Sequence, residues 1–127
     1  MTQVLLVGSG GFLGAVLRYA VGGLVHRQLT FATFPFGTLT VNLVGCFVIG
    51  AVAGLAEARQ VLGPEARLFV LIGLLGGFTT YSTFAFETYA MLRDGEILRA
   101  ALNVGVHVVF GLTLVWLGYA LTSRWTP

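Results

Sequence analysis

Two pairs of polar residues stand inside long apolar runs of the sequence, and the members of each pair are four residues apart. Thr38 and Asn42 form the first pair, and Asn103 and His107 form the second. On a helix this spacing places both members of a pair on one face. An amide or an imidazole is costly to bury in lipid, so each pair predicts either a hydrogen bond to a neighbouring helix or a polar wall along an ion path. The residues alone leave both alternatives open.

Two charged residues, Arg18 and Glu87, also fall within apolar runs. Arg18 stands about seven residues, or roughly 10 Å of helix, before the end of the first run. Its side chain either extends to the membrane surface or lies at the foot of a water-filled vestibule. Glu87 stands about five residues before the end of the third run, where it either faces a vestibule or pairs with an arginine. Both residues are therefore candidates for contact with water inside the membrane.

The segment GGFTTYSTF, residues 76–84, combines two glycines, four hydroxyl residues and three aromatic rings near the middle of the third run. Gly76 and Gly77 followed by Thr79 and Thr80 form helix poorly, which predicts a break between Gly76 and Thr80. Irregular backbone at that depth is tolerated only inside protein or beside a water-filled path. If two copies of the chain pack antiparallel, the two breaks meet on the two-fold axis, and their freed carbonyls could surround a small hard cation.

After this break the helix resumes with rings and hydroxyls on one face. Tyr81, Phe84 and Thr88 follow a helical spacing, and Thr80, Phe84 and Glu87 form an overlapping stripe. Ring edges and hydroxyl hydrogens are electropositive, so this face predicts weak donation to an anion. The alternative is a stripe of core aromatics, which leaves the neighbouring glycines and hydroxyls unexplained.

These residues belong to a chain with the composition of a membrane protein. Of its 127 residues, 57% are hydrophobic and 9% are charged, and the mean hydropathy is +0.91. A helix that crosses the bilayer needs about 20 residues, and four runs meet this length: 4–25, 39–58, 68–92 and 98–120. We therefore predict an all-α integral membrane protein whose residues 1–127 form a single four-span domain in a lipid bilayer.

The arginines give the predicted spans no preferred orientation. Three lie on the side of the termini and three on the opposite side: Arg59, Arg67 and Arg124 against Arg27, Arg93 and Arg99. A chain with such a balance can insert in both directions, and a protein that does so can form an antiparallel pair. Glycines four residues apart, Gly10 with Gly14 and Gly50 with Gly54, offer small-residue faces either to a second copy or to helices of the same chain.

The sequence argues against an enzyme and against a nucleotide- or nucleic-acid-binding protein. No nucleophile stands at motif spacing from a base. The GSGGFL stretch at residues 8–13 lacks the third glycine of a dinucleotide-binding loop. The seven basic residues are scattered arginines, so no basic cluster indicates nucleic acid. The single Cys46 excludes a disulfide within the chain.

Three stretches, GGFLGAVLRY, GTLTVNLVGCFVIG and GGFTTYSTF, resemble in their order and spacing the Fluc-type (CrcB) fluoride channels. The resemblance extends over essentially the whole chain. It implies an antiparallel, dual-topology homodimer in the cell membrane, with the chain inserted in both orientations. It also implies two fluoride pathways, passive export of fluoride, and a structural sodium ion (Na⁺) at the dimer centre that is not transported.

By motif position, the resemblance assigns the sodium to the backbone carbonyls of Gly76 and Thr79. It assigns the pore amide to Asn42 and the aromatic pair of the anion pathway to Tyr81 and Phe84. The remaining implied positions are hydroxyl contacts at Ser82 and Thr83 and pathway mouths at Arg18 and Glu87. From the spacing of the polar pairs, we also predict Thr38 on the anion pathway and a polar face of the fourth span at Asn103 and His107.

The chain departs from this family in two places. Family members often carry Phe where this chain has Tyr81, and they commonly carry hydroxyl residues where Gly111 and Val115 stand, one and two turns after His107. These departures place the polar track of the fourth span in question.

The alternative function is a small dual-topology multidrug or cation exporter. Such a proton-coupled carrier needs a buried carboxylate, usually in its first span. This chain has Arg18 there, and Glu87 is the only acid within its predicted spans. A non-conducting membrane assembly subunit is the third alternative, and it predicts no ion flux.

Overall fold

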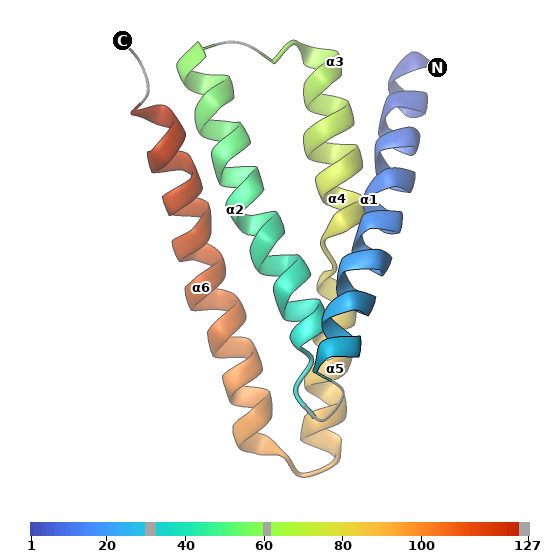
Figure 1. Cartoon of the computed structure of the whole chain (residues 1–127), viewed down its shortest axis with the longest axis vertical. Coiled ribbons are helices and arrows are strands. Elements are labelled where there is room, and N and C mark those ends of the chain that lie inside the picture. Colours follow the sequence, from blue (N-terminus) through green and yellow to red (C-terminus); the bar gives the residue numbers. More distant parts are fainter. Residues whose placement is uncertain (30–32, 60–61, 125–127) are drawn as a thin grey trace.

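Seven helical elements make up the computed structural model, which describes residues 1–29, 33–59 and 62–124 (Figure 1). They are α1 (Thr2–Gln28), α2 (Phe36–Arg59), α3 (Pro64–Arg67), the π-helix η1 (Leu68–Leu75), α4 (Gly76–Phe78), α5 (Tyr81–Arg93) and α6 (Ile97–Ser123). Four helical stretches are long and apolar enough to cross a membrane: Thr2–Gln28, Phe36–Glu57, Pro64–Arg93 and Ile97–Ser123. The predicted four-span, all-α architecture is confirmed for the described residues, with boundaries shifted by a few positions.

The helices run up and down, so that α1 begins and α6 ends at the same end of the molecule, which we call the terminal end (Figure 1). The turn between α5 and α6 lies at the other end, which we call the distal end. The helix α2 packs along α6, while α1 packs along η1 and α4. In Figure 1 these two pairs of helices diverge toward the terminal end.

The molecule buries polar side chains and exposes apolar ones. Asn103 is 0% exposed and Thr80 is 8% exposed, whereas Phe12, Phe86 and Leu112 are 67–70% exposed. In water this distribution would leave a large apolar surface uncovered, which soluble monomers avoid. Lipid tails cover such a surface at no cost, so the distribution of side chains agrees with a bilayer as the surrounding solvent.

Glycines let the helices within one chain approach closely. A Cβ atom on Gly10 would lie 2.5 Å from the carbonyl oxygen of Phe69, and one on Gly14 would overlap the carbonyl oxygen of Leu74. On α2, the corresponding atom on Gly50 would overlap the Val115 carbonyl oxygen. A Cβ on Gly54 would stand 2.7 Å from the carbonyl oxygen of Tyr119. These glycine faces therefore serve packing inside the subunit, the second of the two predicted alternatives.

The third span is broken at Thr79 and Thr80, midway along Pro64–Arg93. Thr79 has φ −82° and ψ 159°, and Thr80 has φ −148° and ψ 106°, so both are extended. The predicted break is confirmed, but its predicted start at Gly76 is wrong, because Gly76 and Gly77 are helical. Gly77 serves close packing instead, since a Cβ there would lie 2.5 Å from the Gly11 carbonyl oxygen.

Candidate functional site

The side chain of Asn42 replaces helical hydrogen bonds that the break removes. The Thr80 N–H donates to Asn42 Oδ1 at 2.8 Å, and Asn42 Nδ2 donates to the Thr80 carbonyl oxygen at 3.1 Å. An amide side chain carries one acceptor and a two-hydrogen donor, so it can pair with both polar groups of one backbone residue. This pairing fixes α2 against the break in the third span, across 38 positions of sequence.

The second amide hydrogen of Asn42 points toward α6. Asn42 Nδ2 lies 3.3 Å from His107 Nε2, and His107 Nδ1 lies 2.9 Å from the carbonyl oxygen of Asn103. Because a carbonyl only accepts, Nδ1 carries the hydrogen, and in the neutral ring Nε2 is then the acceptor for Asn42. The predicted pair of Asn103 and His107 therefore forms hydrogen bonds on one face of α6, and His107 joins this face to α2.

Two threonine side chains cap the helices on either side of the break. Thr79 Oγ1 donates to the Leu75 carbonyl oxygen at 3.0 Å. Thr80 Oγ1 accepts from the Thr83 N–H at 3.3 Å and donates to Thr83 Oγ1 at 2.8 Å. A threonine that caps the first turn of a helix satisfies a donor that has no partner within that helix. The hydroxyls of Thr79 and Thr80 thus stabilise the break.

Backbone carbonyls at the break are released from the helical ladder. In a continuous helix the N–H of Thr80 would donate to the carbonyl of Gly76, and that of Thr83 would donate to the carbonyl of Thr79. In the structure these two donors instead bond to Asn42 Oδ1 and to Thr80 Oγ1. The carbonyl oxygens of Gly76 and Thr79, the predicted sodium ligands, therefore lack their helical donors and have lone pairs that a cation could use.

An aromatic wall stands directly after the break. The ring centroids of Tyr81 and Phe84 are 5.7 Å apart with planes tilted by 53°, and those of Phe84 and His107 are 4.3 Å apart with planes tilted by 43°. Tyr81 is 80% exposed, so its ring has room to meet a further molecule. These rings and Asn42 line one side of a cavity of about 420 Å³, which also contains Cys46. We call it the central cavity.

A chain of two hydrogen bonds links Asn103 of α6 through Thr88 to the backbone carbonyl of Phe84. Asn103 Nδ2 donates to Thr88 Oγ1 at 2.9 Å, and Thr88 Oγ1 donates to the Phe84 carbonyl oxygen at 2.8 Å. Asn103 is 0% exposed, and its Oδ1 has no hydrogen-bond partner in the described part of the chain. Asn103 therefore positions the helix that carries the aromatic wall and does not line the central cavity.

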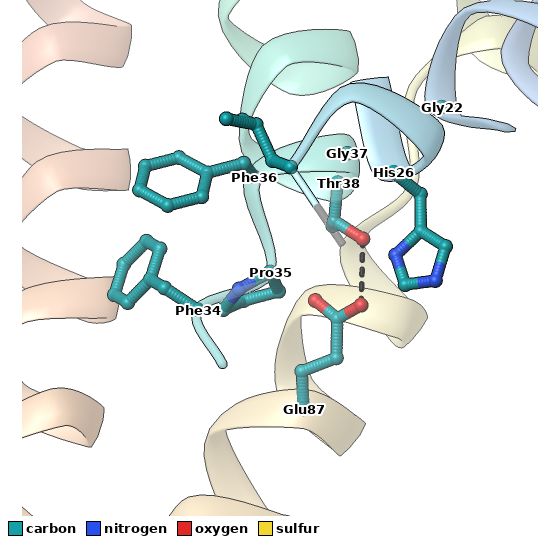
Figure 2. Close-up of a pocket in the computed structure, with 9 residues that line it drawn as sticks. Gly22, His26, Phe34, Pro35, Phe36, Gly37, Thr38 and Glu87 are labelled. Atoms are coloured by element: carbon teal, nitrogen blue, oxygen red, sulfur yellow. Dashed lines mark hydrogen bonds between the residues drawn. The ribbon is translucent and has the colours of Figure 1, made fainter. Parts of the chain in front are cut away.

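A second cavity, of about 210 Å³, lies at the distal end (Figure 2). Thr38 Oγ1 donates to Glu87 Oε1 at 2.7 Å across it. The ion pairs among the described residues are Arg93 with Asp94 and Arg99 with Glu96. Glu87 thus faces a cavity, the first of its two predicted alternatives, and makes no ion pair with an arginine of the described part. We call this space the distal cavity.

Arg18 is half-buried and lines a third cavity of about 330 Å³ together with Thr38, Thr80 and Thr83. Because Thr38 lines both this cavity and the distal cavity, the predicted residues Arg18 and Glu87 stand on two sides of one threonine. Ser82 is different: it is exposed and lines none of these three cavities. The structure therefore brings together all the predicted polar residues of this region except Ser82.

The polar face of α6 ends at His107. Gly111 is buried, and a Cβ on it would lie 3.5 Å from Cys46 Sγ. The backbone of Val115 packs on Gly50 of α2. A side chain at position 111 would thus point at Cys46 of α2, and the backbone at position 115 lies against α2.

His26 lines the distal cavity and was missed by the sequence analysis. A usable signal was present, because Arg18, Gly22 and His26 are successively four residues apart and share one face of α1. Gly22 lines both the cavity of Arg18 and that of His26.

Comparison with known proteins places the chain in one family. Residues 5–119 match the family model of the CrcB-like protein, Camphor Resistance (CrcB). A protein of Methylobacillus flagellatus named "Fluoride-specific ion channel FluC" is 45% identical over 123 residues, covering 97% of this chain and 96% of the relative.

Proteins of the same name in two further organisms are similarly close. The relative in Chlorobaculum tepidum is 46% identical over 125 residues, with 98% of both chains covered. The relative in Chlorobium chlorochromatii is 47% identical over 123 residues, covering 97% of this chain and 93% of the relative. With a family model matched over residues 5–119 and relatives aligned over nearly their full lengths, the chain belongs to the CrcB-like family, a family of ion channels and not of enzymes.

Proposed function

We propose that this protein is a fluoride-selective channel that lets fluoride leave the cell passively. The observation that carries the proposal is the central cavity, where the Asn42 amide, the rings of Tyr81 and Phe84 and the helix break face one space of about 420 Å³. The relatives named as fluoride-specific channels identify the anion that such a site would serve. Fluoride is small and strongly hydrated, so a selective path must replace its water with closely placed donors.

The hydrogen bonds of Asn42 indicate how an anion could be received. Its contact with His107 Nε2, at 3.3 Å, is longer than its contact with the Thr80 carbonyl oxygen, at 3.1 Å. A fluoride ion accepts more strongly than a neutral imidazole, so it would take the amide hydrogen from His107 while Thr80 keeps Asn42 in place. Ring edges of Tyr81 and Phe84 and the hydroxyls of Thr83 and Thr38 would complete the path, with Arg18 and Glu87 at its mouths.

The proposed assembly is an antiparallel homodimer whose copies insert into the cell membrane in opposite orientations. Three observations support it: the balanced arginines, the 80% exposure of Tyr81 beside the break, and an apolar lining that includes Ile49, Leu71 and Leu75 around the central cavity. In such a dimer the carbonyls of Gly76 and Thr79 from both copies would surround a structural Na⁺ that is not transported, because hard cations prefer oxygen ligands.

The decisive experiment is efflux from liposomes that contain the purified protein, measured with a fluoride electrode beside a parallel chloride measurement. We expect fluoride efflux that depends on the protein and far smaller chloride efflux. Equal chloride efflux, or no fluoride efflux, would refute the channel. A proton-coupled drug exporter would instead move organic cations against a proton gradient, and the same liposomes test this alternative.

The sodium and the dimer need their own measurements. Replacing Na⁺ on both sides by N-methylglucamine is expected to abolish fluoride efflux and to lower the temperature at which the purified dimer dissociates. Unchanged efflux and unchanged dissociation would remove the structural ion from the proposal. For the dimer, single-molecule photobleaching of labelled protein in membranes should show two copies per particle.

A further inference from the structure

Three helices contribute polar groups to the distal cavity (Figure 2). His26 comes from the last turn of α1, Thr38 from the first turn of α2 and Glu87 from α5, while Phe34 and Pro35 supply an apolar wall. The volume of about 210 Å³ exceeds the share of about 30 Å³ that one water molecule takes in the liquid. The cavity can therefore hold an ion together with some of its water.

One oxygen of the Glu87 carboxylate accepts a hydrogen bond, and the other oxygen has no hydrogen-bond partner among the described residues. Thr38 Oγ1 holds Glu87 Oε1 at 2.7 Å, whereas Oε2 is buried and has no hydrogen-bond partner within the described residues. Leaving a buried carboxylate oxygen without a donor or a cation is costly. No arginine of the described part forms an ion pair with this carboxylate. The geometry thus provides a carboxylate that is held through Oε1 and has Oε2 free to act as a ligand.

His26 supplies a nitrogen ligand to the same space. Its side chain is exposed, so its ring is free to turn. Figure 2 shows the ring beside the hydrogen bond between Thr38 and Glu87. One imidazole nitrogen with one carboxylate oxygen suits zinc, cobalt and nickel ions, whereas sodium and magnesium prefer oxygen ligands alone.

We propose that His26 and Glu87 together bind a divalent transition-metal ion of the zinc class in the distal cavity. The Thr38 hydroxyl positions the carboxylate, and water molecules complete the coordination of the metal. A consequence that rests on the proposed function is that the metal slows fluoride efflux, because it fills a cavity at the mouth of the fluoride path. Metal binding itself does not depend on whether the protein conducts fluoride.

The binding test uses the purified full-length protein titrated with Zn²⁺, and separately with Co²⁺, whose visible absorption reports its coordination. We expect saturable binding of one ion per chain and no competition from Mg²⁺. His26→Ala and Glu87→Gln should each weaken Zn²⁺ binding by about tenfold or more. Thr38→Val keeps both ligands but frees the carboxylate, so it should weaken binding less.

Glu57→Gln is the matched control. Glu57 lies at the terminal end, where it accepts a hydrogen bond from Tyr119, so this substitution should leave the Zn²⁺ affinity unchanged.

Two outcomes would overturn the site: equal Zn²⁺ affinity in the wild-type protein and in His26→Ala, or loss of affinity in Glu57→Gln as large as that in Glu87→Gln. Fluoride efflux is then measured with and without Zn²⁺. Efflux that Zn²⁺ slows in the wild type but not in His26→Ala supports the placement of the site at the mouth. A protein that binds Zn²⁺ as expected but shows no fluoride efflux refutes the proposed function and leaves the metal site standing.

Discussion

The terminal and distal parts of this molecule are held together by different forces. Toward the terminal end, most contacts run through glycine: Gly50 and Gly54 bring α2 into backbone contact with α6, and Gly10 and Gly14 bring α1 into contact with the third span. One partly buried side-chain hydrogen bond, from Thr122 Oγ1 to the Ala51 carbonyl oxygen at 2.9 Å, adds to the contact of α2 with α6. From the break toward the distal end, side chains make most of the links between helices: Asn42 to Thr80 and His107, Thr38 to Glu87, and Asn103 to Thr88. One glycine contact lies there too, since a Cβ on Gly37 would stand 3.0 Å from the Gly22 carbonyl oxygen.

This difference between glycine contacts and side-chain hydrogen bonds bears on where polar cavities can form between the helices. Backbone contact through glycine leaves no space between helices and needs no polar groups. The distal cavity and the cavity of Arg18 lie among the helices that these side-chain hydrogen bonds join. The distal part thus places structural hydrogen bonds beside the groups that the proposed anion path would use.

The largest effect is expected from Asn42→Leu, which removes the hydrogen bonds that join α2 to Thr80 and to His107. The Thr80 N–H and carbonyl would lose their partner inside the protein, at about 1–3 kcal/mol per group, or about 2–6 kcal/mol in total. Unfolding of the purified protein in SDS titrations measures this loss, and liposome efflux should show fluoride transport abolished.

Thr113→Val is the control for Asn42→Leu. Thr113 is exposed on α6 and donates only to the Val109 carbonyl oxygen of its own helix, so its loss should change neither stability nor efflux appreciably. If Asn42→Leu behaves like Thr113→Val, the central role of Asn42 is wrong.

In the glycine-packed part, Gly50→Val is expected to cost about 3 kcal/mol, because the new side chain would overlap the Val115 carbonyl, which belongs to backbone and cannot move aside. Gly105→Val is the matched control on α6, since a Cβ there meets nothing within 4 Å. Thermal unfolding and the yield of monodisperse protein compare the two variants. Equal stabilities would show that close backbone contact does not hold this part together.

A smaller effect tests whether hydrogen bonding itself stabilises the distal part. Thr88→Val should cost about 1–2 kcal/mol, because it leaves the buried Asn103 Nδ2 without its acceptor. Combining it with Asn103→Leu removes both polar groups and should restore most of the loss. Unfolding free energies of the two single variants and the double variant form a cycle that measures the coupling. Additive effects would mean that the two side chains do not interact.

The features that could be predicted from the sequence are those written into local composition. Apolar runs predicted the four spans, and the cluster of glycine and threonine predicted the break. The role of Gly77 could not be read in this way, because a glycine that breaks a helix and one that permits contact with Gly11 look the same in sequence. The π-helix at Leu68–Leu75 likewise has an apolar composition that suits an α-helix equally well.

The site was predictable in its residue types but not in its pairings. Asn42 and Thr38 were identified as polar residues on one helical face, yet Asn42 pairs with Thr80 and Thr38 with Glu87, residues separated by 38 and 49 positions. Such partners are set by the packing of α2 against the third span, which no local pattern encodes. Ser82 belonged to the predicted path by motif position, and the structure leaves it exposed outside the three cavities.

The smallest effect is expected at the terminal end from Tyr119→Phe. Tyr119 donates to Glu57 Oε2 at 2.5 Å, and this short hydrogen bond would be important if polar links held both parts of the molecule. The two groups are exposed, however, and water replaces a lost partner at an exposed site with little net change. The helices α2 and α6 are already in close backbone contact at Gly50 and Gly118. A Cβ atom added to either glycine would overlap a backbone carbonyl of the facing helix. We therefore expect no measurable shift of the thermal unfolding midpoint and no change in fluoride efflux. A loss of stability as large as that of Thr88→Val would mean that hydrogen bonds, and not glycine contacts, also hold the terminal part.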